Sequence, residues 1–257
     1  MRIGAILVSI AMSLVVLTLF FVWRTDATQQ PIADDQVKHW HRIEDFPDQQ
    51  IAQFETVFWE PRDTESLRQL IRDTSLVQNK TVLEIGTGTG LISLCCLRAG
   101  ASRVVATDIN PAAIANVRFN VEQLQLDERL ELRTVPLDDP GAFSIVGETE
   151  QFDLIISNPP WENQRPQSID QYALYDEDFA LMRSLLAGLK EHLAPGGKAL
   201  LAYGCVDAIK TLCRLAPEYK LQVRQLDDRH LDDLSEVFLP GMLIQVKPLV
   251  STESDPN

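Results

Sequence analysis

The segment Asn158-Pro159-Pro160-Trp161 brings together an amide, two prolines and an aromatic ring. The prolines remove two backbone N–H groups and stiffen the loop. The Asn158 side-chain oxygen and the Pro159 carbonyl could then accept both hydrogens of a substrate –NH₂ group, which directs the nitrogen lone pair at an electrophile. Trp161 offers a flat face to a planar amide or base. The segment predicts chemistry at a planar nitrogen without a general base; a structural turn with an exposed tryptophan is the alternative.

A glycine-rich segment, Glu84-Ile85-Gly86-Thr87-Gly88-Thr89-Gly90, could cradle a ligand. Its glycines let the backbone turn tightly and approach a ligand closely. Their spacing is one residue tighter than the G-x-G-x-x-G pattern of dinucleotide sites. The Glu84 carboxylate would repel a pyrophosphate but attract an ammonium group. The segment therefore favours a cationic nucleoside over a dinucleotide, and a plain turn between a strand and a helix is the alternative.

A third candidate, Asp108, stands 22 residues after Gly86. An acidic residue about 20 residues beyond such a glycine segment binds ribose hydroxyls in nucleotide sites. A carboxylate can accept protons from both vicinal hydroxyls, so Asp108 is the expected ribose ligand. The alternative is an electrostatic role at the N-terminus of the following helix. That helix is expected to begin at Pro111, with Asn110 as its N-cap.

The three segments each follow a run of residues that predicts a β-strand. Apolar runs bounded by turn residues predict strands, and helical periodicity predicts helices between them. Such alternation predicts an α/β fold with a seven-stranded, mostly parallel sheet and helices on both faces. Ligands bind these sheets beyond the carboxyl ends of the strands, where the three segments lie. The expected strands are 81–85, 104–107, 130–135, 152–157, 198–203, 221–225 and 243–246, and the expected helices are 91–99, 111–124, 176–193 and 206–215.

Together the glycine segment, Asp108 and the Asn-Pro-Pro-Trp segment resemble class I S-adenosylmethionine-dependent methyltransferases over about residues 56–203. In that resemblance, the (D/N)PP(Y/F/W) loop marks the branch that methylates planar nitrogen. Residues 57–65, VFWEPRDTE, resemble a segment of HemK-type protein glutamine methyltransferases and related small-domain methyltransferases. The resemblance implies a Rossmann-like fold and S-adenosylmethionine as the cofactor.

The resemblance also implies a role for individual residues. Asp108 would hold the ribose, Ile109 would pack on the adenine and Thr64 would close over the cofactor. The cofactor-binding residues would be Thr64, Glu84, Gly86, Thr87, Gly88, Gly90, Asp108, Ile109 and Asn158. The catalytic residues, which orient or flank the acceptor nitrogen, would be Asn158, Pro159, Pro160 and Trp161. The family usually has tyrosine where Trp161 stands, and an acid where this chain has Val135-Pro136.

Residues 3–23 form an uncharged, apolar run that predicts a transmembrane helix. As a helix this run spans about 31 Å, the thickness of a bilayer's hydrocarbon core. It is longer than the apolar region of a signal peptide and lacks a small-x-small cleavage pattern, which favours an uncleaved anchor. We therefore expect an anchor over 1–25, a linker with one short helix over 26–55, the methyltransferase domain over 56–250 and a disordered tail over 251–257.

Charge and composition narrow the choice of acceptor. The chain has a formal charge of −14, and residues 26–257 carry −16 because residues 1–25 hold two arginines and no acid. Such an acidic body disfavours nucleic acid, whose binding depends on neutralised phosphates. The favoured acceptor is a protein side-chain amide. The alternatives are an adenine or guanine amino group in RNA or DNA, and a catalytically silent scaffold.

Cysteine spacing gives no indication of a metal site. The four cysteines, at positions 95, 96, 205 and 213, form neither a CxxC pair nor a zinc-binding spacing, so buried free thiols and no metal are expected. His39-Trp40-His41 is a weak metal signal because a third ligand is missing.

The predicted anchor makes the chain a single-pass membrane protein. Because S-adenosylmethionine is an intracellular metabolite, we expect its catalytic domain to face the cytoplasm.

Overall fold

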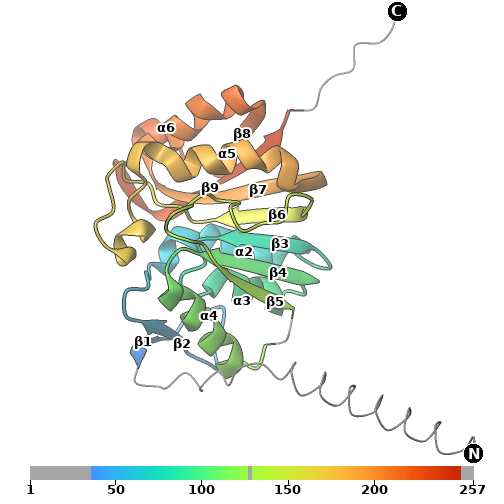
Figure 1. Cartoon of the computed structure of the whole chain (residues 1–257), viewed down its shortest axis with the longest axis vertical. Coiled ribbons are helices and arrows are strands. Elements are labelled where there is room, and N and C mark those ends of the chain that lie inside the picture. The colour runs from blue at the N-terminus through green and yellow to red at the C-terminus, as the bar shows by residue number, and fades with distance from the viewer. Residues whose placement is uncertain (1–35, 127–128, 250–257) are drawn as a thin grey trace, which may run out of the picture. The chain divides into compact units, whose positions relative to one another are not determined.

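Seven strands form the main sheet of the computed structural model, which describes residues 36–126 and 129–249. They are β3 (Thr81–Ile85), β4 (Arg103–Asp108), β5 (Leu130–Thr134), β6 (Phe152–Ser157), β7 (Leu193–Cys205), β8 (Leu221–Gln225) and β9 (Val237–Pro248). Their order in the sheet is β5-β4-β3-β6-β7-β9-β8 (Figure 1). The first five run parallel, and β9 pairs antiparallel with β7 and β8. The prediction of a mostly parallel, seven-stranded sheet is confirmed.

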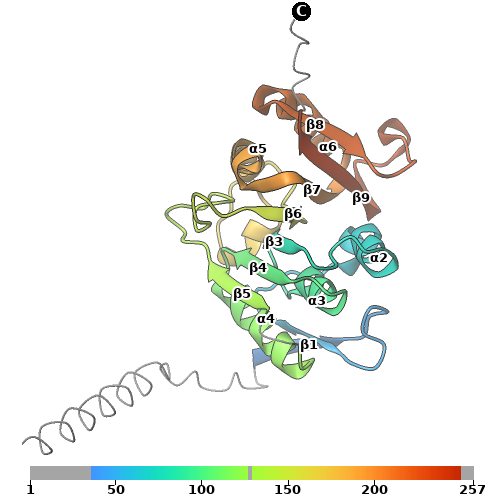
Figure 2. The ribbon, with the colours of Figure 1, turned by 90° about the vertical axis from the view of Figure 1, so that its right-hand side faces the viewer.

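Helices cover both faces of this sheet, as predicted. They are α2 (Glu65–Asp73), α3 (Leu91–Arg98), α4 (Pro111–Gln123), α5 (Ala180–His192) and α6 (Val206–Leu215). Because side chains alternate along a strand, Val82 and Leu83 enter different cores. Val82 packs with residues of α2 and α3, and Leu83 packs with residues of α5 and α6. Figure 2 shows α2 and α3 on one side of the sheet and α5 on the other.

The helix predicted over 176–193 begins later, at Ala180. Asp178 and Phe179 have φ angles of 54° and 53°, which a right-handed helix cannot include. Asp176 instead accepts hydrogen bonds at 2.8 and 3.1 Å from the N–H groups of the first turn of α5. The segment before the helix is thereby free to form part of a loop, which becomes important for the site.

Strands β7 and β9 are longer than the predicted 198–203 and 243–246. They pair with each other from Ala199↔Val246 to Cys205↔Val237, so each extends the other's hydrogen-bond ladder. Strand β7 also begins ahead of the turn residues Pro195-Gly196-Gly197, because Leu193 pairs with Phe152 of β6. The turn signal at that point was therefore misleading about where the strand starts.

A two-stranded hairpin lies in the described part of the expected linker over 26–55, for which the sequence predicted a linker with one short helix. Strand β1 (Val37–His41) pairs antiparallel with β2 (Ile51–Phe54). The two histidines of the hairpin's first strand flank Trp40, and His41 stacks on Trp59 with ring centroids 4.1 Å apart. His41 and Trp59 thus act as packing groups.

Two buried asparagines of α4 hold the hairpin against this helix. Asn120 accepts a hydrogen bond from the Ala52 N–H at 2.8 Å, and Asn116 accepts one from the Phe54 N–H at 2.9 Å. Both amides donate back to the Ala52 carbonyl, at 3.0 and 2.9 Å. Asn120 also donates to the carbonyl of Thr89, in the glycine segment, at 2.9 Å. Side-chain amides thus replace a neighbouring strand, which hydrophobic periodicity cannot reveal.

The predicted anchor over residues 3–23 and the predicted tail over 251–257 lie outside the described residues. Within residues 36–126 and 129–249, none of the helices has the length and apolar character needed to cross a membrane. Cys95, Cys96 and Cys205 are buried free thiols as expected, and burial raises the pKa of Cys95 to about 12. Cys213 is exposed, contrary to that expectation.

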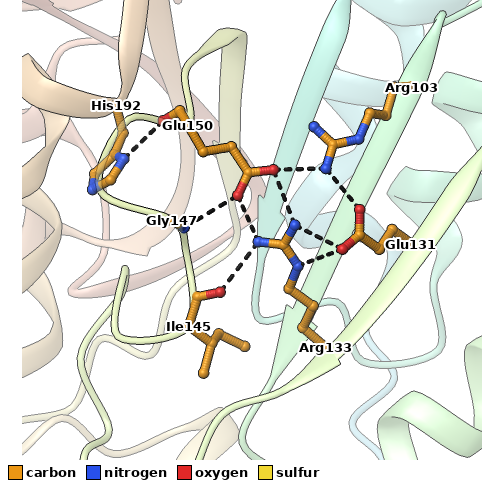
Figure 3. Close-up of polar contacts among 7 residues, drawn as sticks. All are labelled: Arg103, Glu131, Arg133, Ile145, Gly147, Glu150 and His192. Atoms are coloured by element: carbon orange, nitrogen blue, oxygen red, sulfur yellow. Dashed lines mark hydrogen bonds and ion pairs between the residues drawn. The ribbon is translucent and has the colours of Figure 1, made fainter.

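Ion pairs join β4, β5 and the loop before β6 (Figure 3). Glu150 accepts from Arg103 Nη2 at 2.6 Å and from both Arg133 Nη atoms at 2.7 and 2.9 Å. Glu131 accepts hydrogen bonds from the same two arginines. The backbone carbonyl of Glu150 lies 2.9 Å from His192 Nδ1 at the end of α5. The arginines lower the pKa of Glu150 to about 2.

Replacing Glu150 with glutamine should lower the free energy of unfolding at neutral pH. Hydrogen bonds to charged groups contribute about 1.5–3 kcal/mol, and several are weakened together. Because the folded-state pKa is depressed, the contribution is present above the unfolded pKa and is lost as pH falls from about 4.5 toward 2. Urea unfolding of wild type and Glu150→Gln at pH 7 and pH 3 measures this, with the exposed Glu148→Gln as control. An equal difference in unfolding free energy between wild type and Glu150→Gln at both pH values would contradict a stabilising role for the ionised Glu150.

Candidate active site

A cavity of about 460 Å³ lies beyond the carboxyl ends of β3, β4 and β6. Its wall combines segments that are far apart in the sequence, because parallel strands end at the same edge of the sheet. The predicted site residues that line it are Thr64, Glu84, Gly86, Thr87, Gly88, Asp108, Ile109, Asn158, Pro159 and Pro160. The structure therefore brings most of the predicted site together around one space.

The glycine segment after β3 is held by the buried carboxylate of Glu84. Glu84 Oε2 accepts hydrogen bonds from Thr87 Oγ1 at 2.8 Å, from the Ser93 N–H at 3.1 Å and from the Ser93 hydroxyl. Burial raises the pKa of Glu84 to about 7, although these hydrogen bonds act in the opposite direction. Gly88 has a φ of 55°, which favours glycine, and a Cβ there would meet only the Phe58 carbonyl at 3.8 Å. The loop thus leaves open space beside its backbone.

Asp108 ends β4 and faces the same cavity. Its Oδ2 accepts a hydrogen bond from the Gly88 N–H at 2.9 Å, and its Oδ1 accepts one from the Asn110 N–H at 2.8 Å. Burial raises the pKa of Asp108, and these backbone donors counteract the rise. A carboxylate has about four acceptor positions, so capacity remains for ribose hydroxyls. Asn110 caps α4 through the Ala112 N–H at 2.9 Å, as predicted.

Asn158 follows β6 and lines the cavity with Pro159 and Pro160. Its Oδ1 is buried and has no hydrogen-bond partner among the described residues. The side-chain amide lies beside the carboxyl of Asp63, a residue that the sequence reasoning did not select. Burial raises the pKa of Asp63 to about 6, and Asn158 offsets part of that rise. An unpartnered acceptor in the cavity wall is suited to receive a ligand N–H.

Two predicted site residues, Gly90 and Trp161, are absent from the cavity wall. Gly90 precedes α3 with a φ of 84°, and a Cβ there would lie 2.8 Å from Val117, so its role is to let α3 and α4 pack closely. Trp161 packs against the core of α5 and α6 and near Gly204. The role of Trp161 beside the acceptor stays a prediction.

A loop before α5 adds aromatic groups to the cavity wall. Glu162 and Tyr175 form a β-bridge that closes the base of this loop, and the Glu162 N–H donates to the Leu174 carbonyl at 3.0 Å. Tyr172 and Tyr175 line the cavity from it. Beyond β5, Val135 and Pro140 line the cavity, whereas Asp138 and Asp139 are exposed and absent from its wall. Sequence reasoning missed this loop because it assigned its end to α5.

The charged side chains of the described cavity wall are all acidic. Its ionisable residues are Glu60, Glu84, Asp108, Asp170, Asp176, Glu177 and two tyrosines, with no lysine, arginine or histidine among the described lining residues. Such a wall attracts cations and repels phosphate groups. Nor do the described residues contain a cluster of three or more histidine, cysteine, aspartate or glutamate side chains placed to hold a metal ion.

Solved structures with the same fold belong to methyltransferases. A ribosomal protein L11 methylase from Lactobacillus delbrueckii subsp. bulgaricus superposes with a TM-score of 0.57 at 18% identity, over 87% of this chain and 92% of that one. A 16S rRNA N2 G1207 methyltransferase from T. thermophilus, solved with AdoMet and guanosine, also gives 0.57 at 16% identity, over 87% and 53%. At these identities the likeness shows the fold alone, which is that of class I methyltransferases.

The sequence places the chain more narrowly. Residues 57–205 match the methyltransferase small domain, so the chain belongs to that family of S-adenosylmethionine-dependent methyltransferases, as its motifs indicated. It is 32% identical over 150 residues to a tRNA1(Val) (adenine(37)-N6)-methyltransferase of Shewanella loihica, covering 58% of this chain and 61% of that protein. It is 37% identical over 136 residues to a release factor glutamine methyltransferase of Cereibacter sphaeroides, covering 48% and 46%. The chain thus spans about half the length of such relatives.

The residues of the cavity fit the family's cofactor. Open space lies beside Gly86 and Gly88, and the carboxylates of Glu84 and Asp108 border it. These acids suit the ammonium and ribose groups of S-adenosylmethionine, and the apolar Ile109 side chain, which lines the same cavity, suits the adenine base. Thr64, from the segment before α2, lines the same space and is buried.

Replacing Asp108 with alanine should weaken S-adenosylmethionine binding by about 10- to 100-fold, because hydrogen bonds to a charged group are lost. Calorimetric titration of the purified protein measures the affinity. Asp228→Ala removes an exposed aspartate outside the cavity and should bind as wild type does. Unchanged affinity for S-adenosylmethionine in a folded Asp108→Ala protein would contradict the predicted contact between Asp108 and the ribose.

Proposed function

We propose that this chain transfers a methyl group from S-adenosylmethionine to a planar nitrogen, and that a protein side-chain amide is its favoured acceptor. The observation that carries the proposal is the buried Asn158 Oδ1 in the cavity wall, which has no hydrogen-bond donor among the described residues. An unpaired buried acceptor costs roughly 1–3 kcal/mol, and a bound –NH₂ group would relieve that cost. In this proposal the acceptor –NH₂ group is the hydrogen-bond donor that Asn158 Oδ1 lacks.

The bound cofactor would supply an electrophilic methyl group on a sulfonium sulfur. Asn158 Oδ1 and the Pro159 carbonyl would accept the two N–H groups of the acceptor and turn its lone pair toward the cofactor. As the new N–C bond forms and the S–C bond breaks, positive charge grows on nitrogen, and the two acceptors stabilise it. The methylated nitrogen would then release one proton to solvent water. The chain thus contributes orientation and charge stabilisation, which require no general base.

The charge of the cavity supports a protein acceptor. Glu60, Asp170 and Glu177 border the cavity outside the glycine segment, and no lysine or arginine of the described lining is available to a phosphate. Tyr172 and Tyr175 could flank a flat amide. A second candidate acceptor is the amino group of adenine or guanine in nucleic acid, which the similarity to a tRNA adenine methyltransferase favours.

Transfer of a labelled methyl group separates these candidates. The full chain is incubated with methyl-labelled S-adenosylmethionine and separated protein and RNA fractions of a cell extract. Label in protein that acid hydrolysis releases as methylamine identifies a methylated side-chain amide. Label in RNA that weakens steeply with salt would favour the second candidate. Cofactor binding without transfer to either fraction would favour a silent scaffold.

Asn158→Ala should lower turnover by about 100-fold or more, because loss of one group that stabilises transition-state charge has effects of that size. Its affinity for S-adenosylmethionine should remain close to that of wild type. Asn79→Gly, an exposed position with a φ of 57° in the turn before β3, is the matched control. Wild-type turnover in Asn158→Ala would contradict the proposed mechanism.

We further propose that residues 3–23 anchor the protein as a single membrane span, with the catalytic domain facing the cytoplasm, where S-adenosylmethionine is made. The support is the uncharged apolar run in the sequence. The full chain should stay with membranes after a carbonate wash, and Val15→Arg with Val16→Arg should release it, because each arginine costs about 2.5–3.5 kcal/mol at a span's centre. Release of the wild-type chain would contradict the anchor.

A further inference from the structure

Asp63 is a buried carboxyl that belongs to none of the roles assigned so far. It lies in the 3-10 helix η2 (Pro61–Thr64), between the cavity and the strands β7 and β9, and only 1% of it is exposed. Glycines on both strands make room for it. A Cβ at Gly241 would collide with the Asp63 backbone, and one at Gly204 would lie 3.3 Å from Asp63 Oδ1. The fold therefore provides a fitted place for this side chain.

Within the described residues, Asn158 is the side chain whose hydrogen bond lowers the pKa of the Asp63 carboxyl, and Glu60 is a charged neighbour that raises it. Both oxygens of this carboxyl lack a partner with full hydrogen-bond geometry, and the adjacent side-chain amide is that of Asn158. Burial is costly for a carboxylate without donors, so the arrangement calls for an explanation. Asn158 Oδ1 is the other buried, unpartnered atom of this pair. The Asn158 side chain thus lies between the buried Asp63 carboxyl and the proposed position of the acceptor nitrogen.

We propose that Asp63 is a positioning residue, which accepts from the Asn158 amide N–H and so fixes and polarises the Asn158 carbonyl toward the acceptor nitrogen. This inference rests on the proposed function. A carboxylate behind the amide places negative charge on the side away from the acceptor, which makes Oδ1 a stronger partner for the nitrogen as its positive charge grows. In the unliganded state such contacts are often loose and tighten when a ligand binds.

Asp63 should therefore act in its ionised form. Its pKa of about 6 places the change of charge between pH 5 and pH 7. Glu60 of the neighbouring turn is the charged group that raises this pKa, Asn158 lowers it, and β7 and β9 present Gly204 and Gly241 to it. Protonation below pH 6 should weaken the pull on the Asn158 amide, and the effect should be absent once the carboxyl is replaced.

Two cofactor analogues test this without knowledge of the acceptor. S-adenosylhomocysteine has a neutral sulfur, whereas sinefungin carries an amine in place of the methylsulfonium group. In the proposed geometry that amine takes the place of the transferred methyl group, which faces the Asn158 side chain, so it should donate to Asn158. Calorimetry on the full chain at pH 5.5 and pH 7.5 gives the ratio of the two affinities. The ratio cancels contributions of Glu84 and Asp108, whose ligand groups both analogues share.

In wild type, the preference for sinefungin should fall roughly tenfold from pH 7.5 to pH 5.5, the size expected for a hydrogen bond that loses a charged partner. The Asp63→Asn substitution keeps the shape of the side chain but removes its charge. In this variant the ratio of sinefungin affinity to S-adenosylhomocysteine affinity should be low and independent of pH. Asp73→Asn, an exposed aspartate at the end of α2, should behave as wild type does.

A wild-type ratio that does not change with pH would overturn the proposal even if Asp63→Asn failed to fold. A folded Asp63→Asn protein with the wild-type ratio and pH dependence would also overturn it. Absence of S-adenosylhomocysteine binding by the folded wild type would instead overturn the proposed function itself. Binding of S-adenosylhomocysteine with equal affinity in wild type and Asp63→Asn, and loss of the sinefungin preference in the variant alone, is the result that the positioning role predicts.

Discussion

Parallel strands end at a common edge, and this constraint determines the rest of the site. Strands β4, β3 and β6 lie side by side, so the segments that follow them meet although they are separated by tens of residues in the sequence. The chain continues from β3 to β4 on one side and reaches β6 on the other, which opens a crevice between them. The glycine segment, Asp108 and Asn158 occupy that crevice. Their chemistry depends on this topology.

Buried polar groups then hold the loops at the crevice in place. Glu84 ties the glycine segment to α3, Asn120 ties it to the hairpin, and Asp108 accepts from the Gly88 N–H. These groups have partners, whereas Asn158 Oδ1 and Asp63 do not. Buried polar atoms without partners are rare in folded proteins. The Tyr203 hydroxyl is another such atom among the described residues, but it does not line the cavity, whereas Asn158 Oδ1 belongs to the cavity wall, where a ligand can donate to it.

Local patterns were sufficient for the sheet and for the motifs. Apolar runs predicted the strands, and Asn110 with Pro111 predicted the start of α4 correctly. The hairpin, the loop before α5 and Asp63 depend on long-range contacts that no local pattern encodes. Asp63 becomes distinctive only when β7 and β9, more than 130 residues later, bury it. The packing of Trp161 against the core of α5 and α6 is likewise a long-range contact that the sequence pattern does not encode.

A crystal structure of the full chain with S-adenosylhomocysteine is the most direct test of the central claim that the acceptor nitrogen is oriented by Asn158. The account predicts that the ligand lies between the glycine segment and the Asn158 loop, with its ribose hydroxyls at Asp108 and its sulfur facing the Asn158 side chain. A ligand whose sulfur faces away from Asn158, or that occupies another part of the protein, would contradict the account.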